Sequence, residues 1–211
     1  LREQEYLALA KQGLGGEAAV TAAISPEQLV CEHVERLIAT PGALQVLDFA
    51  GGRAQLVAVR ALHGGALVGH EIRELRRHLP QGMEVRVAAI FRKGQAVKPE
   101  GITVIEAGDE VFFLAPQAAI KAMMSELRSA DKRLTKRIFI SGGGGIGRRL
   151  AKSLEHRYSI KVLERSRERA RAIAEDLLNT IVLIGDCADE DLLREENIDQ
   201  TDVYCALTND D

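Results

Sequence analysis

A run of glycines between an apolar segment and an amphipathic one limits the possible folds of this chain more than any other feature. Residues 138–140 are Ile-Phe-Ile. Three glycines follow in the spacing G-x-G-x-x-G, namely Gly142, Gly144 and Gly147. A strand, such a glycine turn and then a helix form the first half of a dinucleotide-binding unit. We therefore predict that backbone N–H groups at the start of this helix bind phosphate, the alternative being a tight turn without a ligand.

The segment around this loop alternates short apolar runs with helical ones. Strands alternating with helices are typical of βαβ units with a parallel sheet. We predict strands at 137–141, 160–163, 180–184 and 203–207, and helices at 146–156, 167–178 and 190–196. The pattern ends after its fourth strand. The fold class is therefore α/β, and residues 135–211 are predicted to form a truncated Rossmann-type parallel sheet.

Polar residues follow the predicted strands, at the sheet edge where open α/β folds bind ligands. Glu164 lies about 20 residues after the loop, where an acidic residue accepts hydrogen bonds from ribose hydroxyls and repels a 2′-phosphate. Arg165 and Arg167 weaken that repulsion. We expect Asp186 to bond the adenine amino group and Cys187 to lie against the ring, although polar turns after strands are also common. The predicted binding set is Gly142, Gly143, Gly144, Gly145, Ile146, Gly147, Glu164, Arg165, Asp186, Cys187, Thr208, Asn209 and Asp210.

Residues 41–130 have a different pattern, which predicts a smaller α+β module. Gly51 and Gly52 between two apolar runs are a hairpin signal. We predict strands at 43–49, 54–60, 85–91, 103–105 and 111–114, and helices at 71–79 and 116–127. Residues 1–40 are interpreted as the tail of a preceding domain. Ser25-Pro26-Glu27 begins a helix whose apolar stripe needs a partner surface.

Composition and cysteine usage exclude several classes of function. The chain is acidic overall, at −3, with 4% aromatic residues and no Trp, which disfavours a nucleic-acid partner. Three cysteines without CxxC spacing indicate reduced thiols and no structural metal. No histidine follows His156, so Cys187 lacks a sequence-local base, and we expect no catalytic residues and no enzyme activity. The alternative is the cofactor domain of an NAD-dependent oxidoreductase whose substrate site lies elsewhere.

Together these residues closely resemble the regulators of potassium conductance (the RCK or KTN family), and specifically the regulatory subunits of bacterial Trk potassium uptake. Such subunits contain tandem units, each a nucleotide-binding N-lobe followed by a smaller C-lobe. The residues that carry the resemblance are 25–30, 36–38 and 41–46 at the first junction, 86–92, 99–101 and 108–113 in the first C-lobe, and 142–147, 185–186 and 208–211 in the second N-lobe.

The resemblance implies a domain order and a function for the whole chain. Residues 1–40 would be the tail of a first N-lobe with its linking helix, 41–130 the first C-lobe, and 135–211 a truncated second N-lobe. The chain is therefore expected to be a central fragment. It would belong to a cytoplasmic subunit, peripheral on the inner face of the cell membrane and tetrameric at full length. That subunit would bind NAD(H) or ATP/ADP and gate a potassium-translocating membrane subunit of the TrkH or TrkG type.

Overall fold

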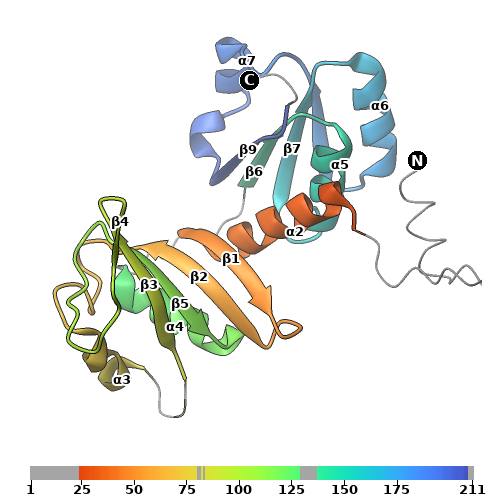
Figure 1. The fold of residues 1–211 in the computed structure, drawn as a ribbon. Helices are drawn as coiled ribbons and strands as arrows, with labels where there is room; N and C mark the ends of the chain where they lie inside the picture. Colours follow the sequence, from red (N-terminus) through yellow and green to blue (C-terminus); the bar gives the residue numbers. More distant parts are fainter. Residues whose placement is uncertain (1–23, 80–81, 83, 129–136, 209–211) are drawn as a thin grey trace, which may run out of the picture. The chain divides into compact units, whose positions relative to one another are not determined.

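A computed structural model describes residues 24–79, 82, 84–128 and 137–208, and their secondary structure forms two compact units (Figure 1). The first unit comprises residues 1–35 and 135–211, and the second comprises residues 36–134. One division falls inside the helix α2 (Pro26–Ala39), a few residues before the division expected at residue 40. The first 23 residues of the expected N-lobe tail, the polar run 129–135 and the predicted ligand residues Asn209 and Asp210 lie outside the described residues.

The described part of the first unit is a βαβ fold around a four-stranded parallel sheet in the order β8-β7-β6-β9. Its strands are β6 (Arg137–Ser141), β7 (Ser159–Glu164), β8 (Thr180–Ile184) and β9 (Val203–Ala206). Its helices after the glycine loop are α5 (Gly145–Leu154), α6 (Arg167–Asp176) and α7 (Glu190–Glu195), with the 3₁₀ helix η2 (Ile198–Gln200) before β9. The predicted parallel α/β architecture is confirmed.

Strand β6 lies at the centre of this unit. Neighbouring residues of a strand point to opposite faces of the sheet, and the four residues 138–141 are all buried. Both faces of the sheet are therefore covered at β6, as the continuous apolar run required. The edge strand β8 is more open, with Ile181 and Ile184 about half exposed.

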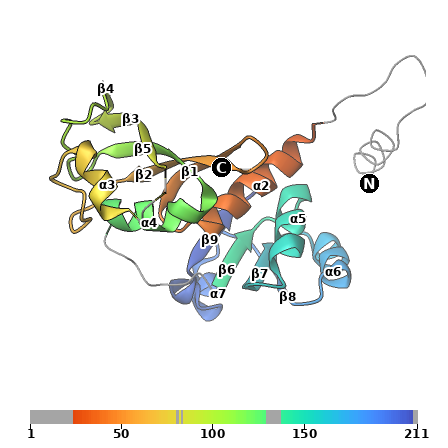
Figure 2. The same ribbon diagram turned by 90° about the horizontal axis from the view of Figure 1, so that it is seen from below.

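Helix α2 packs through its first half on α5, within the same unit (Figures 1 and 2). Ser25 caps it, because its hydroxyl accepts a hydrogen bond from Gln28 N at 3.3 Å. Cys31 is buried and its thiol reaches Ile146 O at 3.5 Å. Cys31 and Glu35 of α2 thus contact α5, a segment far away in the sequence, whereas Leu29 and Val30 of the predicted apolar stripe are 51% and 40% exposed.

The second unit is built on a five-stranded antiparallel sheet in the order β1-β2-β5-β3-β4. The strands are β1 (Ala43–Phe49), β2 (Ala54–Arg60), β3 (Arg86–Arg92), β4 (Gln95–Val97) and β5 (Glu110–Ala115). Its helices are η1 (Ile72–Glu74), α3 (Leu75–His78) and α4 (Gln117–Leu127). The β1–β2 turn contains Gly51 and Gly52 at φ of 67° and 84°, the positive values that a tight hairpin favours.

Two local predictions for this unit were wrong. The segment 71–79 is a 3₁₀ turn followed by one short α-helical turn instead of a continuous helix. The segment 103–105 is no strand, and Val104 forms only an isolated bridge with Glu71. Both segments are short, and their few apolar residues pack against the core of the unit. This packing does not need the continuous helix or the strand that the apolar periodicity predicted.

The core of the second unit lies between the sheet and α4. Met123 and Leu127 of α4 are fully buried with Val57, Val59 and Phe113 of the strands. Met123 is therefore a packing residue of the core.

A buried ion pair closes one side of this unit. Asp109 is 1% exposed and receives Arg92 Nε at 2.8 Å and Arg92 Nη2 at 2.9 Å. Burial opposes the ionisation of Asp109, but the hydrogen bonds from Arg92 and Glu106 N outweigh it and hold the pKa of Asp109 below its ordinary value. The pair fixes the turn before β5 to the end of β3.

Candidate nucleotide site

The glycine loop between β6 and α5 has two positions that accept no other residue. Gly142 has φ of 104°, and a Cβ there would lie 2.5 Å from Leu207 O. A Cβ at Gly147 would lie 1.9 Å from Gly142 O. The first glycine therefore allows the turn against the end of β9, and the last allows α5 to approach the strand. These are the general roles of the first and last glycines in a G-x-G-x-x-G turn.

Gly144 differs, because a Cβ at this position would have nothing within 4 Å. It is the N-cap of α5, at φ −66° and ψ −169°, with no side-chain cap. The backbone therefore does not require glycine here, and the space above it is open. An open N-cap at the start of a helix is the place where a phosphate is bound in this class of loop.

A carboxylate from another element stands beside this helix start. A Cβ at Gly145 would lie 2.7 Å from Glu27 Oε2 and 2.8 Å from Glu27 Oε1. Glu27 is in the first turn of α2. A negative charge near a helix N-terminus stabilises that helix and opposes a second anion at the same place. The sequence analysis missed Glu27, because no local pattern reports a contact between segments so far apart.

Glu164 is the most constrained of the predicted ligand residues. It is 4% exposed at the end of β7. Its Oε2 accepts a hydrogen bond from Gly143 N at 3.0 Å, and its Oε1 accepts one from Ser166 N at 2.7 Å. Arg169 adds two more to Oε1, from Nε at 3.1 Å and Nη2 at 2.9 Å. Glu164 therefore ties the glycine loop to the start of α6.

These partners decide the ionisation of Glu164. Burial raises the pKa of the carboxyl, but hydrogen bonds from Ser166 N, Arg169 and Gly143 N outweigh burial and leave the pKa below its ordinary value. Arg169 was not among the predicted residues, although its place in the first turn of α6 was a usable signal. A long side chain there folds back over the preceding strand end.

The remaining predicted residues lie at neighbouring strand ends. Asp186, after β8, accepts a hydrogen bond from Ala188 N at 3.0 Å and lies 3.7 Å from Arg165 Nε. Cys187 is half-buried beside it. Leu207 N, after β9, donates to Ser141 O at 2.7 Å, so Thr208 follows directly at the loop. The structure thus brings loop, Glu164 and the end of β9 together, and pairs Arg165 with Asp186.

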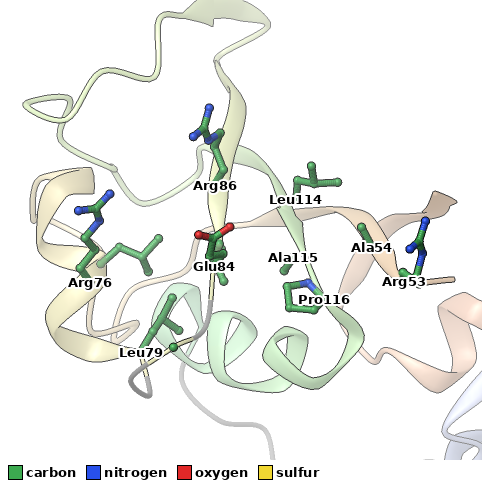
Figure 3. Close-up of a pocket in the computed structure, with 12 residues that line it drawn as sticks. Arg53, Ala54, Arg76, Leu79, Glu84, Arg86, Leu114, Ala115 and Pro116 are labelled. Atoms are coloured by element: carbon green, nitrogen blue, oxygen red, sulfur yellow. The ribbon is translucent and has the colours of Figure 1, made fainter. Parts of the chain in front are cut away.

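A separate pocket of about 960 Å³ is made entirely of second-unit residues (Figure 3). Arg53, Arg76 and Arg86 line it with Glu84, over apolar residues that include Leu114. None of these residues was expected at a site.

Among the described residues there is no group of His, Cys, Asp and Glu suited to a metal ion. No helix in that part of the chain is long and apolar enough to cross a membrane.

Comparison with known families adds two matches that meet almost end to end. The TrkA-C domain model matches residues 56–128, and the TrkA-N domain model matches residues 138–211. The chain carries a TrkA-C domain followed by a TrkA-N domain. The TrkA-N domain begins with β6 and the glycine loop, and the TrkA-C domain contains most of the antiparallel sheet. The resemblance predicted from the sequence is confirmed.

Two curated relatives match this chain over nearly all of its length. The Trk system potassium uptake protein TrkA of Vibrio alginolyticus is 52% identical over 213 residues, which covers 100% of this chain and 46% of that protein. The protein of the same name from Halomonas elongata is 51% identical over 205 residues, which covers 96% of this chain and 44% of the relative. The chain therefore spans a little under half the length of these relatives.

Solved structures share the fold. The RCK domain of GsuK has a TM-score of 0.57 and 21% identity, covering 98% of this chain and 42% of that one. The GsuK channel bound to NAD has a TM-score of 0.56 and 20% identity, covering 98% of this chain and 34% of that one. These similarities show that both units adopt RCK-type folds.

Proposed function

We propose that this chain is part of a regulatory subunit of potassium uptake, and that its TrkA-N domain binds NAD(H), ATP or ADP. The observation that carries the proposal is the loop geometry. Gly142 and Gly147 are required by their surroundings, whereas Gly144 faces open space at the start of α5. A glycine kept where the protein itself does not need one is accounted for by a ligand that approaches the backbone there.

Regulation, as opposed to catalysis, is supported by the chemistry around the loop. Asp186 and Cys187 are the reactive types nearest to the predicted ligand, and among the described residues no histidine accompanies them at these strand ends. Nucleotide binding would instead bias the protein between two arrangements, through a difference in affinity for each. The names of the relatives support potassium uptake as the process regulated.

The proposal extends to the partners of the complete protein. We propose a potassium-translocating membrane subunit of the TrkH or TrkG type as the gated partner, and a tetramer of regulatory subunits on the cytoplasmic face of the membrane. The relatives' system name, Trk, supports such a partner. A difference in nucleotide affinity between two arrangements of that assembly would supply the coupling free energy.

Substitution of Gly144 by Val tests the binding site. Because a Cβ at Gly144 would have no protein atom within 4 Å and the φ of this residue is ordinary, the variant should fold normally. It should lose affinity for NADH, ATP and ADP by about a hundredfold, since the side chain takes the place of the phosphate. Isothermal titration of the purified full-length protein measures this.

The matched control is Gly101→Val, which places the same side chain in the TrkA-C domain with only an ordinary contact, to Arg73 Cβ at 3.6 Å. Wild-type protein that binds none of the three nucleotides would refute the proposal. Net oxidation of NADH by the wild type with a candidate substrate would favour an oxidoreductase instead.

A further inference from the structure

Arg169, in the first turn of α6, contacts the predicted nucleotide site but was not among the residues predicted from the sequence. Ser166 caps α6 by accepting a hydrogen bond from Arg169 N at 3.3 Å, which fixes the backbone of Arg169 in the first turn. The side chain then returns over the end of β7 and donates Nε and Nη2 to Glu164 Oε1. The carboxylate and the guanidinium are thus joined by two charge-assisted hydrogen bonds.

The two oxygens of Glu164 are used unequally. Oε1 accepts three N–H groups, from Ser166 and Arg169. Oε2 accepts only that of Gly143, at 3.0 Å. A carboxylate oxygen can accept at least two hydrogen bonds, so Oε2, which accepts one, keeps an acceptor position for a ligand hydroxyl. The carboxylate is therefore still able to hold a ribose while its charge is already paired.

The guanidinium remains accessible after it pairs. The Arg169 side chain is 66% exposed, whereas that of Glu164 is 4% exposed. The neighbouring basic residues do not duplicate its position, since Arg165 lies against Asp186 and Arg167 has no carboxylate partner among the described residues. The exposed side chains at this strand end therefore include three arginines, although the residue directly behind Arg169 is an acid.

We propose that Arg169 is the specificity-determining residue for the ribose 2′ position, and that it lets the site accept NADP(H) as well as NAD(H). This inference rests on the proposed nucleotide site. An isolated acid at this position rejects a 2′-phosphate, whereas a nearby arginine accommodates one. Here the arginine cancels the charge of the acid and presents donors outward. The expectation that Glu164 excludes a 2′-phosphate, weakened by Arg165 and Arg167, is replaced by a role for Arg169.

The test compares NADH with NADPH on the full-length protein by isothermal titration. Wild-type protein should bind the two within about tenfold of each other, because the Glu164 charge is paired. Arg169→Met keeps the aliphatic stem and removes the charge. This substitution should lower the affinity for NADPH by about tenfold relative to that for NADH, because the unpaired Glu164 carboxylate then faces the 2′-phosphate. Arg169→Lys restores a positive charge and should recover part of the lost affinity for NADPH.

Arg171→Met is the matched control. Arg171 lies on the same helix with its side chain exposed, and the substitution removes the same charge. It should leave the ratio of the two affinities unchanged. A wild-type preference for NADH above about a hundredfold would overturn the inference without needing any variant. Equal weakening of both ligands in Arg169→Met would also overturn it, since Arg169 would then only position Glu164. Binding of neither ligand by the wild type would refute the nucleotide site as well.

Discussion

At the scale of single residues, Glu164 links the chemistry of the site to the stability of the fold. Its carboxylate accepts hydrogen bonds from the loop, from the start of α6 and from Arg169. Loss of a buried charged acceptor leaves its donors unpaired. Glu164 therefore holds the glycine loop in place, and we propose that its Oε2 also accepts a hydrogen bond from the ligand.

A pH dependence of stability follows from the lowered pKa of Glu164. A carboxyl whose pKa is lower in the folded protein stabilises it above the unfolded pKa, and that stability is lost as the pH falls through the folded pKa. Glu164→Gln should therefore cost about 2 kcal/mol at neutral pH and progressively less below about pH 4. Urea unfolding of both proteins across this range measures the difference. A cost that stays constant as the pH falls to about 3, below the ordinary pKa of a glutamate, would contradict a lowered pKa of Glu164.

At the scale of secondary-structure elements, α2 brings a negative charge to the start of α5. Glu27 lies where a ligand phosphate would feel its charge, since both of its oxygens are close to Gly145. We expect Glu27→Gln to tighten the binding of ATP and NADH by about tenfold, because one like charge is removed. Glu32→Gln makes the same change one turn further along α2, where the carboxylate accepts a bond from Gln28, and serves as the control. Equal effects of both variants would indicate a general charge effect.

Much of the first unit could be predicted from the sequence because its signals are local. Each predicted strand from 137 to 207 matches an observed one to within a few residues, since apolar runs bounded by helices leave little choice. The glycine roles followed from spacing alone. The position of Arg169 in the first turn of α6 was a usable signal that the prediction did not use. The contact of Glu27 could not be predicted, because it depends on which helix α2 meets. The segment 71–79 failed for a related reason, as tertiary packing decided its backbone.

At the scale of the whole molecule, the chain combines two units with different means of stabilisation. The TrkA-N domain contains the proposed nucleotide site, whereas the TrkA-C domain depends on its own core and on the Arg92–Asp109 pair. A ligand stabilises the folded part to which it binds. The two units should therefore respond to different perturbations.

Hydrogen exchange followed by mass spectrometry can separate those responses. Saturating NADH should slow the exchange of amides in β6 and α5 by about tenfold or more. Asp109→Asn should leave this protection intact but speed exchange in β3 and β5, because breaking a buried ion pair costs about 3 kcal/mol. If NADH protected β3 and β5 as strongly as β6, the ligand would be acting on the TrkA-C domain.

The position of β9 has a consequence for biosynthesis. β9 is the last strand of the described sheet, yet it pairs with β6, and Leu207 O lies against Gly142. While the chain emerges from the ribosome, β6, α5 and β7 can assemble early, but the loop lacks one of its walls until residue 207 has been translated. During this interval β6 is an exposed edge, open to pairing with another nascent chain. The proposed nucleotide site therefore lacks this wall until β9 has been made and has paired with β6.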